Sequence, residues 1–526
     1  MRVFFLKLFI FCLFTTRAIA AGLPEPVSDA LKHAHIPLSS VSIVVEETGD
    51  TEPLISLNAE RPMNPASTMK LLTTFAALET LGPAYRWKTE AYLDGKLENG
   101  VLQGDLVFKG YGDPKLTVEQ FWMWLRELRQ RGLREIRGDI VLDHSFFQAA
   151  NQDPAEFDND PTRAYNVGTS ALLLNFNALH LHLIPNGHAT IALLEPALSG
   201  YTVINLITTS RKLHCGGEDA YKARLDGHDI VLEGSIPESC GEADDYFSLL
   251  PQDEYFFAVF SALWQELGGT VQGKMRVGLA PAGQAPFASY ISPPLSEVIR
   301  DINKFSNNVM ARQLFLTLGT AGAAQEAQAS TGTGIPSATD GKGDRDDSSA
   351  VQALGETSVL AGQQRGGDSA GSDSAVAMPV AAGVLQPASI ARSMAAIRQW
   401  LSTQQLQFPE LVLENGAGLS RRERISAQHL AELLRLATNS PFNAELEASL
   451  PILGMDGTVK KRFKDSGIAG YAHLKTGSLE GVKSIAGYVK AHSGKQWVVV
   501  FIVNHPNAAL AQPAQDALIE WLQKGS

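Results

Sequence analysis

The chain has 526 residues, of which 44% are hydrophobic, which is enough to bury more than one core and to form about two to four domains. Its formal net charge is -12 and no basic stripe runs along it, so a nucleic-acid-binding protein is not expected. Composition therefore indicates a globular protein of several domains whose partner is not nucleic acid.

Residues 1–20 are typical of a secretory signal peptide. Positive charge at Arg2 and Lys7 precedes an apolar run over residues 8–14, and the Ala-Ile-Ala sequence at 18–20 fits a cleavage site of small residues. We expect cleavage after Ala20, because the apolar run is much shorter than the ~20 residues that an uncleaved membrane anchor needs. The mature chain is therefore expected outside the cytoplasm, without a transmembrane span.

A β-hairpin and a helix are predicted before residue 88. The apolar segments Val41–Val45 and Leu54–Leu57 flank a turn at Gly49-Asp50, which is typical of a hairpin. A helical run from Ser67 to Leu81 follows, and Gly82-Pro83 ends it as a glycine cap and a proline should.

Residues 89–284 are rich in strands and turns and are predicted to form one or two accessory domains. We interpret them as an insertion into one main domain, residues 21–88 and 285–526, because elements on both sides are expected to share a sheet. The clearest strand candidates are residues 104–108, 138–142, 179–183 and 203–208.

Two cysteines remain after removal of the signal peptide, Cys215 and Cys240. In an oxidising compartment we expect one disulfide between them, worth roughly 3 kcal/mol in the chain-entropy model. A metal site built on the two thiols is the alternative, but no C-x-x-C or H-x-x-H pattern lies near them. His180 and His182 alternate with leucines as the solvent-facing residues of a strand do, so a metal site at these histidines is not expected.

Residues 321–386 are expected to form a disordered insert within the main domain. The segment consists mostly of Ala, Gly, Ser, Gln and Asp, and it cannot bury enough apolar surface to offset the entropy of ordering. Helical patterns at 308–316 and 390–401 flank it. A tether or partner-binding segment is the functional alternative to a tolerated insertion.

The C-terminal region is predicted to complete the main domain with three successive strands and a closing helix. The strands are expected at 471–478, 484–489 and 496–503, and the helix at 511–523. Together with the N-terminal hairpin, these strands plausibly form one antiparallel sheet, covered by helices.

The sequence Ser67-Thr68-Met69-Lys70 is the first of three motifs that supply the groups needed for acyl transfer by a serine enzyme. Positions three apart share a helix face, so the amine of Lys70 can reach the hydroxyl of Ser67 and take its proton. The positive field of the helix N-terminus favours the neutral, basic form of Lys70. An ordinary surface serine and lysine are the alternative for this motif taken alone.

The second motif is Ser306-Asn307-Asn308, at the junction of two helical patterns. Ser306 is expected to relay a proton between Lys70 and a leaving amine, and Asn308 to hold a substrate amide. A helix cap in which Ser306 binds a backbone N–H is the structural alternative, and both could hold.

The third motif, Lys475-Thr476-Gly477, lies on a predicted strand. Lys475 would supply positive charge for a substrate carboxylate, Thr476 a hydroxyl, and Gly477 room for close approach of the substrate backbone. The backbone N–H groups of Ser67 and Ser478 are the expected oxyanion donors. A solvated lysine at a strand end is the alternative for this motif alone.

Together the three motifs resemble the signature of the penicillin-binding proteins and serine β-lactamases. The long separation of the first two motifs, Gly110–Pro114 between them, and Gly416–Arg421 before the third are similar to the class C low-molecular-mass D-alanyl-D-alanine carboxypeptidase/endopeptidases. The resemblance implies an α/β (α+β) penicillin-binding domain with an antiparallel sheet, interrupted by inserted β-rich domains. It also implies action on peptidoglycan peptides in the periplasm, without a cofactor, and inhibition by β-lactam antibiotics.

The same resemblance implies a substrate contact for Asp113, whose carboxylate would meet the amine of a diaminopimelate side chain. A turn residue before Pro114 is the structural alternative. The chain departs from the family at Asn415 and Ala417, where Asp and Ser are more usual. Two other functions remain open at this point: a serine β-lactamase, and a catalytically idle wall-binding sensor.

Overall fold

The computed structural model describes residues 22–50, 52–148, 153–187, 189–211, 221–331 and 386–525, without the side chains of 321–331. The expected signal peptide (1–20), Cys215 and residues 332–385 lie outside these ranges, so predictions about them stay predictions. None of the helices in the described ranges combines the length and apolar composition that a bilayer crossing requires.

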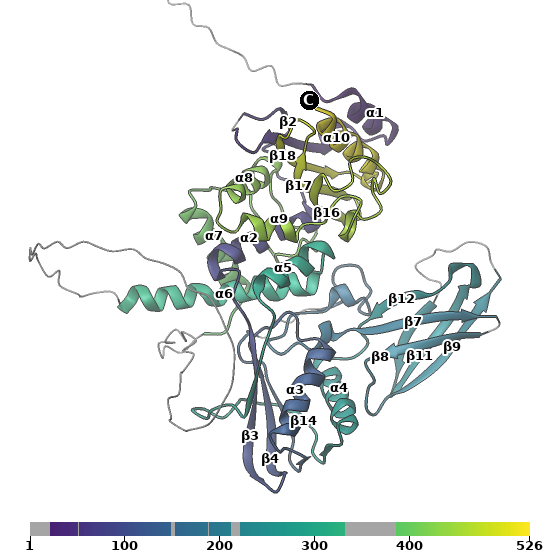
Figure 1. Cartoon of the computed structure of the whole chain (residues 1–526), viewed down its shortest axis with the longest axis vertical. Coiled ribbons are helices and arrows are strands. Elements are labelled where there is room, and N and C mark those ends of the chain that lie inside the picture. Colours follow the sequence, from purple (N-terminus) through teal and green to yellow (C-terminus); the bar gives the residue numbers. More distant parts are fainter. Residues whose placement is uncertain are drawn as a thin grey trace, which may run out of the picture. The chain divides into compact units, whose positions relative to one another are not determined.

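A five-stranded antiparallel sheet brings the N-terminal hairpin beside the C-terminal strands (Figure 1). Its strand order is β16-β17-β18-β1-β2, and Val41 of β1 pairs with Val503 of β18. The prediction that both regions share one antiparallel sheet is confirmed. The strands are β1 (Val41–Glu47), β2 (Ile55–Leu57), β16 (Ala472–Leu479), β17 (Val482–Lys490) and β18 (Gln496–Asn504).

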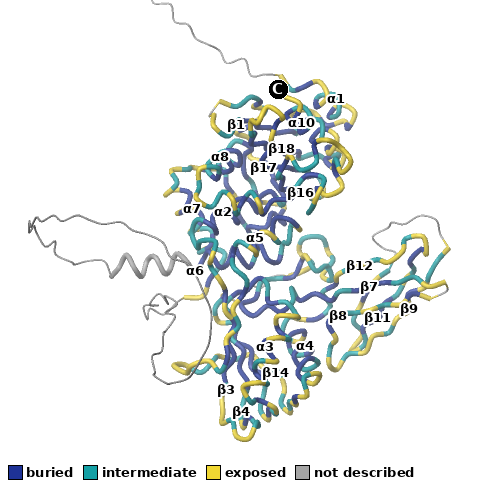
Figure 2. The backbone as a smooth tube through the Cα atoms, in the orientation of Figure 1, coloured by how far each residue is buried: buried dark blue, intermediate teal, exposed yellow. Residues whose placement is uncertain are grey.

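Helices cover both faces of this sheet, because side chains of successive strand residues point to opposite faces. Val499 and Phe501 of β18 pack with α1 and α10, whereas Val500 and Ile502 pack with the helices of the other face. The strands are accordingly buried along most of their length (Figure 2). One face is covered by α1 (Glu25–His33) and α10 (Gln512–Gly525); the other layer contains α2 (Lys70–Leu81), α5 (Leu295–Lys304), α6 (Asn308–Thr331), α7 (Ile390–Thr403), α8 (Ala427–Thr438) and α9 (Asn443–Ser449).

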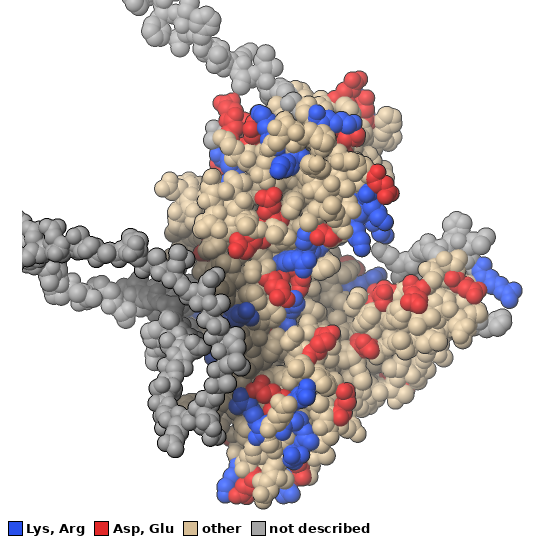
Figure 3. All heavy atoms as spheres, in the orientation of Figure 1, with Lys and Arg blue, Asp and Glu red and all other residues tan. Residues whose placement is uncertain are grey.

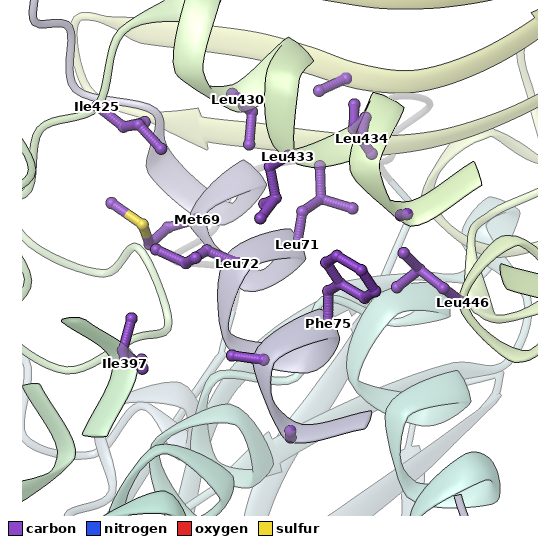
Figure 4. Packing of buried hydrophobic residues seen from close by; sticks show 14 of the residues in the cluster. Met69, Leu71, Leu72, Phe75, Ile397, Ile425, Leu430, Leu433, Leu434 and Leu446 are labelled. Atoms are coloured by element: carbon purple, nitrogen blue, oxygen red, sulfur yellow. The ribbon is translucent and has the colours of Figure 1, made fainter. Parts of the chain in front are cut away.

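Helix α2 is the centre of that second layer. It is apolar around most of its circumference, as expected of a helix surrounded by others. Phe75 and Leu71 point toward Leu434 and Leu446 of α8 and α9 (Figure 4). A 3-10 turn, Ala66–Met69, precedes the helix, and Gly82 ends it with a φ of 79°. The predicted helix is therefore present, and Ser67 lies in its tight first turn.

The accessory region begins with β3 (Lys88–Glu98) and ends with β15 (Ala288–Ile291), which pair with each other. It therefore continues a few residues beyond the predicted boundary at 284, because the short strand β15 closes the edge of an accessory sheet. The four expected strands fall within β4, β6, β7 and β9, although β6 begins at Ile140 rather than 138.

Two sheets make up this accessory region, and one apolar core joins them with helices α3 (Val118–Gln130) and α4 (Gln252–Glu266). The seven-stranded sheet contains β3, β15, β4 (Val101–Gly110), β5 (Glu135–Ile136), β6 (Ile140–Asp143), β13 (Thr270–Val271) and β14 (Met275–Val277). The six-stranded sheet contains β7 (Leu179–Asn186), β8 (Ala189–Glu195), β9 (Thr202–Ser210), β10 (Tyr221–Asp226), β11 (Asp229–Pro237) and β12 (Ala243–Phe247).

Helix α6 continues to Thr331 and so enters the segment that was expected to be disordered from residue 321. The run from 321 to 328 is rich in alanine and contains no proline, and such a sequence favours helix once a packed helix precedes it. The disordered insert was predicted to begin at residue 321, but helix α6 continues to Thr331. The predicted start therefore lies too early in the sequence.

Candidate active site

Ser67 and Lys70 face each other at the start of α2. The amine Nζ of Lys70 lies 3.0 Å from the hydroxyl Oγ of Ser67, as the three-residue spacing predicts. Lys70 is fully buried, whereas Ser67 is only partly covered. An accessible hydroxyl beside a desolvated amine is the arrangement that an activated serine nucleophile needs.

Two further oxygens surround the amine of Lys70. Nζ lies 2.6 Å from the side-chain oxygen Oδ1 of Asn308 and 2.5 Å from the backbone carbonyl of Ala417. A neutral amine can donate its two hydrogens to these two acceptors, and its lone pair then points to the hydroxyl of Ser67. The contacts thus orient Lys70 as a base toward the serine.

Electrostatics favour that neutral form. Burial lowers the pKa of Lys70 well below its ordinary value, and the positive charges of Lys475 and Arg312 lower it further. The negative charge of Glu423 opposes this decrease only in part. Because a general base must be unprotonated at the working pH, the lowered pKa suits Lys70 to take the proton of Ser67.

The second motif joins the site through the side chains of both Ser306 and Asn308. Asn308, rather than Ser306, contacts Lys70, and the hydroxyl of Ser306 instead accepts a hydrogen bond of 2.8 Å from Nζ of Lys475. The capping role belongs to Asn307, whose Oδ1 accepts from the backbone N–H of Met310. Ser306 has a φ of 57°, so a strained backbone turns its side chain toward the third motif.

The third motif lies on β16, beside the turn that carries Ser67. Lys475 is fully buried, and burial lowers its pKa to about 7. Thr476 faces outward and bonds to the hydroxyl of Thr458 at 2.7 Å. Ser478, the expected oxyanion donor, is exposed, and its hydroxyl accepts from Lys483.

Gly477 has a packing role that the sequence did not reveal. A Cβ at this position would lie 2.7 Å from the carbonyl oxygen of Pro65 and 2.9 Å from the backbone nitrogen of Ser67. The glycine therefore lets β16 approach the nucleophile turn itself. This close approach brings the backbone of the third motif next to the N–H of Ser67, where an oxyanion would be held.

A loop over residues 414–420 closes the other side of the nucleophile turn. A Cβ on Gly418 would lie only 1.9 Å from the carbonyl oxygen of Ala66. Asn64 ties the two segments together, because its Oδ1 accepts from the N–H of Ala66 and its Nδ2 donates to the carbonyl of Ser420. The departures from the family at Asn415 and Ala417 leave the approach of Gly418 to Ala66 intact, because that approach involves only backbone atoms.

A cavity of about 600 Å³ opens beside this loop. Arg312, one helical turn after Asn308 on α6, contributes to its lining together with Asn415 and Arg421. Acidic side chains such as Glu414 also line it, so the charge of the cavity is mixed. The same interspersion of basic and acidic side chains is visible on the face of the molecule drawn in Figure 3.

Asp113 lies in a turn that the fold covers. Its side chain is 2% exposed, one oxygen accepts from the backbone N–H of Lys115, and burial raises its pKa to about 7. Its other oxygen is buried without a hydrogen-bond partner among the described residues. The substrate contact that the resemblance implies for Asp113 therefore stays a prediction, beside the turn-residue alternative.

The remaining candidates lie in the accessory region. His180 and His182 both bond to Asp244 on the solvent face of β7 and β12. In the parts of the chain that the structure describes, no group of three or more His, Cys, Asp or Glu side chains is arranged to hold a metal ion. The disulfide between Cys215 and Cys240 stays a prediction, since Cys215 is outside the described ranges.

Comparison with known families decides the assignment. A profile of the D-Ala-D-Ala carboxypeptidase 3 (S13) family matches residues 23–338 and 372–525. The chain belongs to this S13 family. It is therefore a serine-type D-Ala-D-Ala carboxypeptidase, and the predictions of family, fold class and reaction class are confirmed.

Individual S13 relatives match along most of the chain. D-alanyl-D-alanine carboxypeptidase DacB of Haemophilus influenzae is 23% identical over 475 residues, covering 89% of this chain and 85% of that protein. D-alanyl-D-alanine carboxypeptidase of Actinomadura sp. (strain R39) is 25% identical over 493 residues, covering 90% and 80%. The crystal structure of penicillin binding protein 4 (dacB) from Haemophilus influenzae shares the fold, with a TM-score of 0.67, 22% identity, and coverage of 94% of this chain and 99% of that chain.

Three features of this S13 site were not found from the sequence. They are the carbonyl of Ala417, the half-buried guanidinium of Arg312, and the buried carboxylate of Glu423. A backbone carbonyl leaves no trace in residue identity. Arg312 and Glu423 have the residue types of an ordinary solvated helix or loop, so only their positions in the fold mark them.

Proposed function

We propose that the three motifs form a single active site in which Ser67 is the nucleophile, Lys70 its base, and Lys475 the anchor for the substrate's terminal carboxylate. The observation that carries this proposal is the 3.0 Å contact between Nζ of Lys70 and Oγ of Ser67, made by a fully buried lysine. The substrate class is a peptidoglycan peptide ending in D-alanyl-D-alanine, or a cross-link with a D-alanyl bond.

In the first half of the reaction, Oγ of Ser67 attacks the carbonyl carbon of the scissile bond as its proton passes to Nζ of Lys70. The negative oxygen that develops is held by the backbone N–H groups of Ser67 and Ser478, each worth about 3 kcal/mol to the transition state. The carbon–nitrogen bond then breaks, and the leaving amine takes up the proton from Lys70. Ser306 is the proposed carrier, and its hydroxyl would have to turn from Lys475, which it contacts in this structure, toward Lys70.

In the second half, water attacks the ester carbonyl of the acyl-enzyme. Lys70, neutral again, accepts a proton from that water and passes it to Oγ of Ser67 as the ester bond breaks, so that both residues return to their starting forms. No cofactor takes part, because both steps need only proton transfer and stabilisation of negative charge.

Lys475 is suited to bind a carboxylate, because a bound anion would stabilise the ammonium form of Lys475 that burial disfavours. Its pKa of about 7 means that the free amine and the ammonium are both populated near neutrality. A carboxylate within contact range stabilises the ammonium, so binding and protonation of Lys475 should be coupled. We place Thr476 and Asn308 at the same substrate, as hydrogen-bonding groups.

β-Lactam antibiotics are the proposed inhibitors, because their strained amide offers Ser67 the same carbonyl chemistry. The related penicillin binding protein 4 (dacB) from Haemophilus influenzae has been solved with a novel β-lactam, at a TM-score of 0.65 and 22% identity. We also propose that the protein acts in the periplasm, supported by the signal-peptide pattern of residues 1–20.

The decisive experiment is covalent labelling. The purified protein is incubated with a labelled penicillin, the adduct is located by peptide mass mapping, and its decay is followed. We expect a long-lived adduct on Ser67, none on Ser67→Ala, and wild-type labelling of the exposed control Ser402→Ala.

Two results would contradict the proposal. Rapid turnover of the adduct would identify a β-lactamase, and equal labelling of wild type and Ser67→Ala would remove Ser67 from the nucleophile position. Release of D-alanine from a D-alanyl-D-alanine peptide, and cleavage of a purified cross-linked dimer, then distinguish the two peptidase activities.

A further inference from the structure

Glu423 is a fully buried carboxylate next to the proposed active site. Its Oε1 accepts hydrogen bonds from three successive backbone N–H groups, those of Glu414, Asn415 and Gly416, at 3.0, 3.0 and 3.1 Å. Its Oε2 is buried without a hydrogen-bond partner among the described residues. A carboxylate is rarely buried at such cost unless it organises its surroundings.

The segment that Glu423 holds ends directly on the catalytic helix. After the three bound N–H groups, the carbonyl of Gly416 accepts from the hydroxyl of Thr73 at 2.6 Å, and the carbonyl of Ala417 accepts from Nζ of Lys70 at 2.5 Å. Both acceptors lie on the same short segment, so the anchor at Glu423 fixes where the Ala417 oxygen meets the amine.

Within the described residues, Glu423 is also the one negative group among the charges that act on Lys70. The positive groups are Lys475 on β16 and Arg312 on α6, and both favour a neutral Lys70. Glu423 favours the ammonium form and interacts with Arg312 as well. Burial raises the pKa of Glu423, whereas the three N–H groups and Lys70 oppose that rise.

We propose that Glu423 is a positioning residue for this reaction: it holds segment 414–417 so that the Ala417 carbonyl directs the lone pair of Lys70 at Ser67, and its negative charge balances the cations Lys475 and Arg312 around that amine. The inference rests on the proposed roles of Ser67 and Lys70. It adds a residue that touches neither substrate nor nucleophile.

The anchor and the charge can be separated by substitution. Glu423→Gln retains an oxygen that accepts the three N–H groups but carries no charge. Glu423→Asp retains the charge but is shorter by one methylene, so it reaches the N–H groups poorly. Glu410→Gln is the matched control, because Glu410 also accepts a backbone N–H, that of Ser426, but acts on no motif residue.

The test is the pH dependence of Ser67 acylation by labelled penicillin, measured under single-turnover conditions. Acylation needs neutral Lys70, so its rate falls at low pH through the pKa of Lys70. Removing the negative charge in Glu423→Gln should move this acid limb to lower pH by at least about half a unit, as expected for one charge at an effective dielectric near 20. Arg312→Met should move it to higher pH.

The plateau rate reports the anchor. Glu423→Asp should keep the acid limb of the wild type but lose about tenfold to a hundredfold in plateau rate, since small misplacements of a catalytic group are costly. Glu410→Gln should match the wild type in both respects. Thermal unfolding of each variant separates these effects from a general loss of folded protein.

An acid limb of Glu423→Gln that is unmoved or shifted upward overturns the charge-balancing role, including the case in which Glu423 is protonated at rest. A plateau rate of Glu423→Asp equal to the wild type overturns the anchoring role. Should Glu423→Gln not fold, Glu423→Asp still decides the anchoring role, and the uncharged Glu423→Met takes the place of Glu423→Gln as the test of the charge-balancing role. Failure of the proposed function itself is distinguishable, because the wild type would then show no adduct on Ser67.

Discussion

Gly418→Ala should damage the site by moving the nucleophile turn. A Cβ there would lie 1.9 Å from the Ala66 carbonyl oxygen and 2.8 Å from the Ser67 nitrogen, whereas ordinary contacts begin at 3.4 Å. One backbone must therefore move by roughly 1.5 Å to restore van der Waals contact. The φ of 78° adds about 1–2 kcal/mol of strain for a residue with a side chain.

A displacement of about 1 Å in a catalytic group costs on the order of a hundredfold in rate. We expect Gly418→Ala to slow Ser67 acylation by about that factor and to lower the unfolding free energy by roughly 1–3 kcal/mol. The assay is the single-turnover rate with labelled penicillin, with thermal unfolding measured in parallel.

The matched control for this prediction is Gly467→Ala, since a Cβ at Gly467 meets nothing within 4 Å and its φ is not in the left-handed range. It should behave as wild type in both assays. If Gly418→Ala is acylated within about threefold of wild type, the packing of the loop on the Ser67 turn does not set the nucleophile's position, and the reasoning is refuted.

Three further predictions concern charge and stability. Because the pKa of Lys475 is about 7, the KM for a carboxylate-terminated peptide should rise as pH increases above 7, while an amide-capped analogue shows no such rise; equal profiles would exclude Lys475 as the anchor. The pKa of Asp113 is raised to about 7 in the folded state against about 3.9 unfolded, so ionisation costs stability progressively between pH 4 and 7, by up to about 4 kcal/mol. Asp113→Asn should therefore melt higher than wild type at pH 8 and equally at pH 4, with kcat unchanged; a large loss of kcat would instead restore the expected substrate contact. Replacing Cys215 and Cys240 by serine should lower stability by roughly 3 kcal/mol, whereas unchanged melting under non-reducing conditions would argue against the predicted disulfide.

Sequence alone predicted the parts of the site whose chemistry demands particular residue types. Ser67, Lys70 and Lys475 were identifiable because a nucleophile, its amine base and a cationic anchor each need a specific side chain at a specific spacing. The shared sheet was predictable too. The segments near both ends of the chain either alternate apolar and polar residues or are continuously apolar, over lengths typical of strands.

Burial and partner choice were not predictable in the same way. Asp113 looks like an accessible turn residue until the fold covers it, and the contact of Ser306 with Lys475 depends on a backbone φ of 57° at Ser306. Helices α3 and α4 were missed within a region whose turns and strands dominate its pattern. Each of these depends on contacts between segments distant in the chain.

The pairing of β1 with β18 has a consequence for the biosynthesis of the protein. Ser67 is synthesised early, but Lys475 and the strands that support it emerge only near the end of translation. A nascent chain thus carries its nucleophile before the cationic partner has been synthesised. The active site can form only after the last strands have been synthesised. Because β1 and β18 are far apart in the sequence, we expect their pairing to be a slow step in folding.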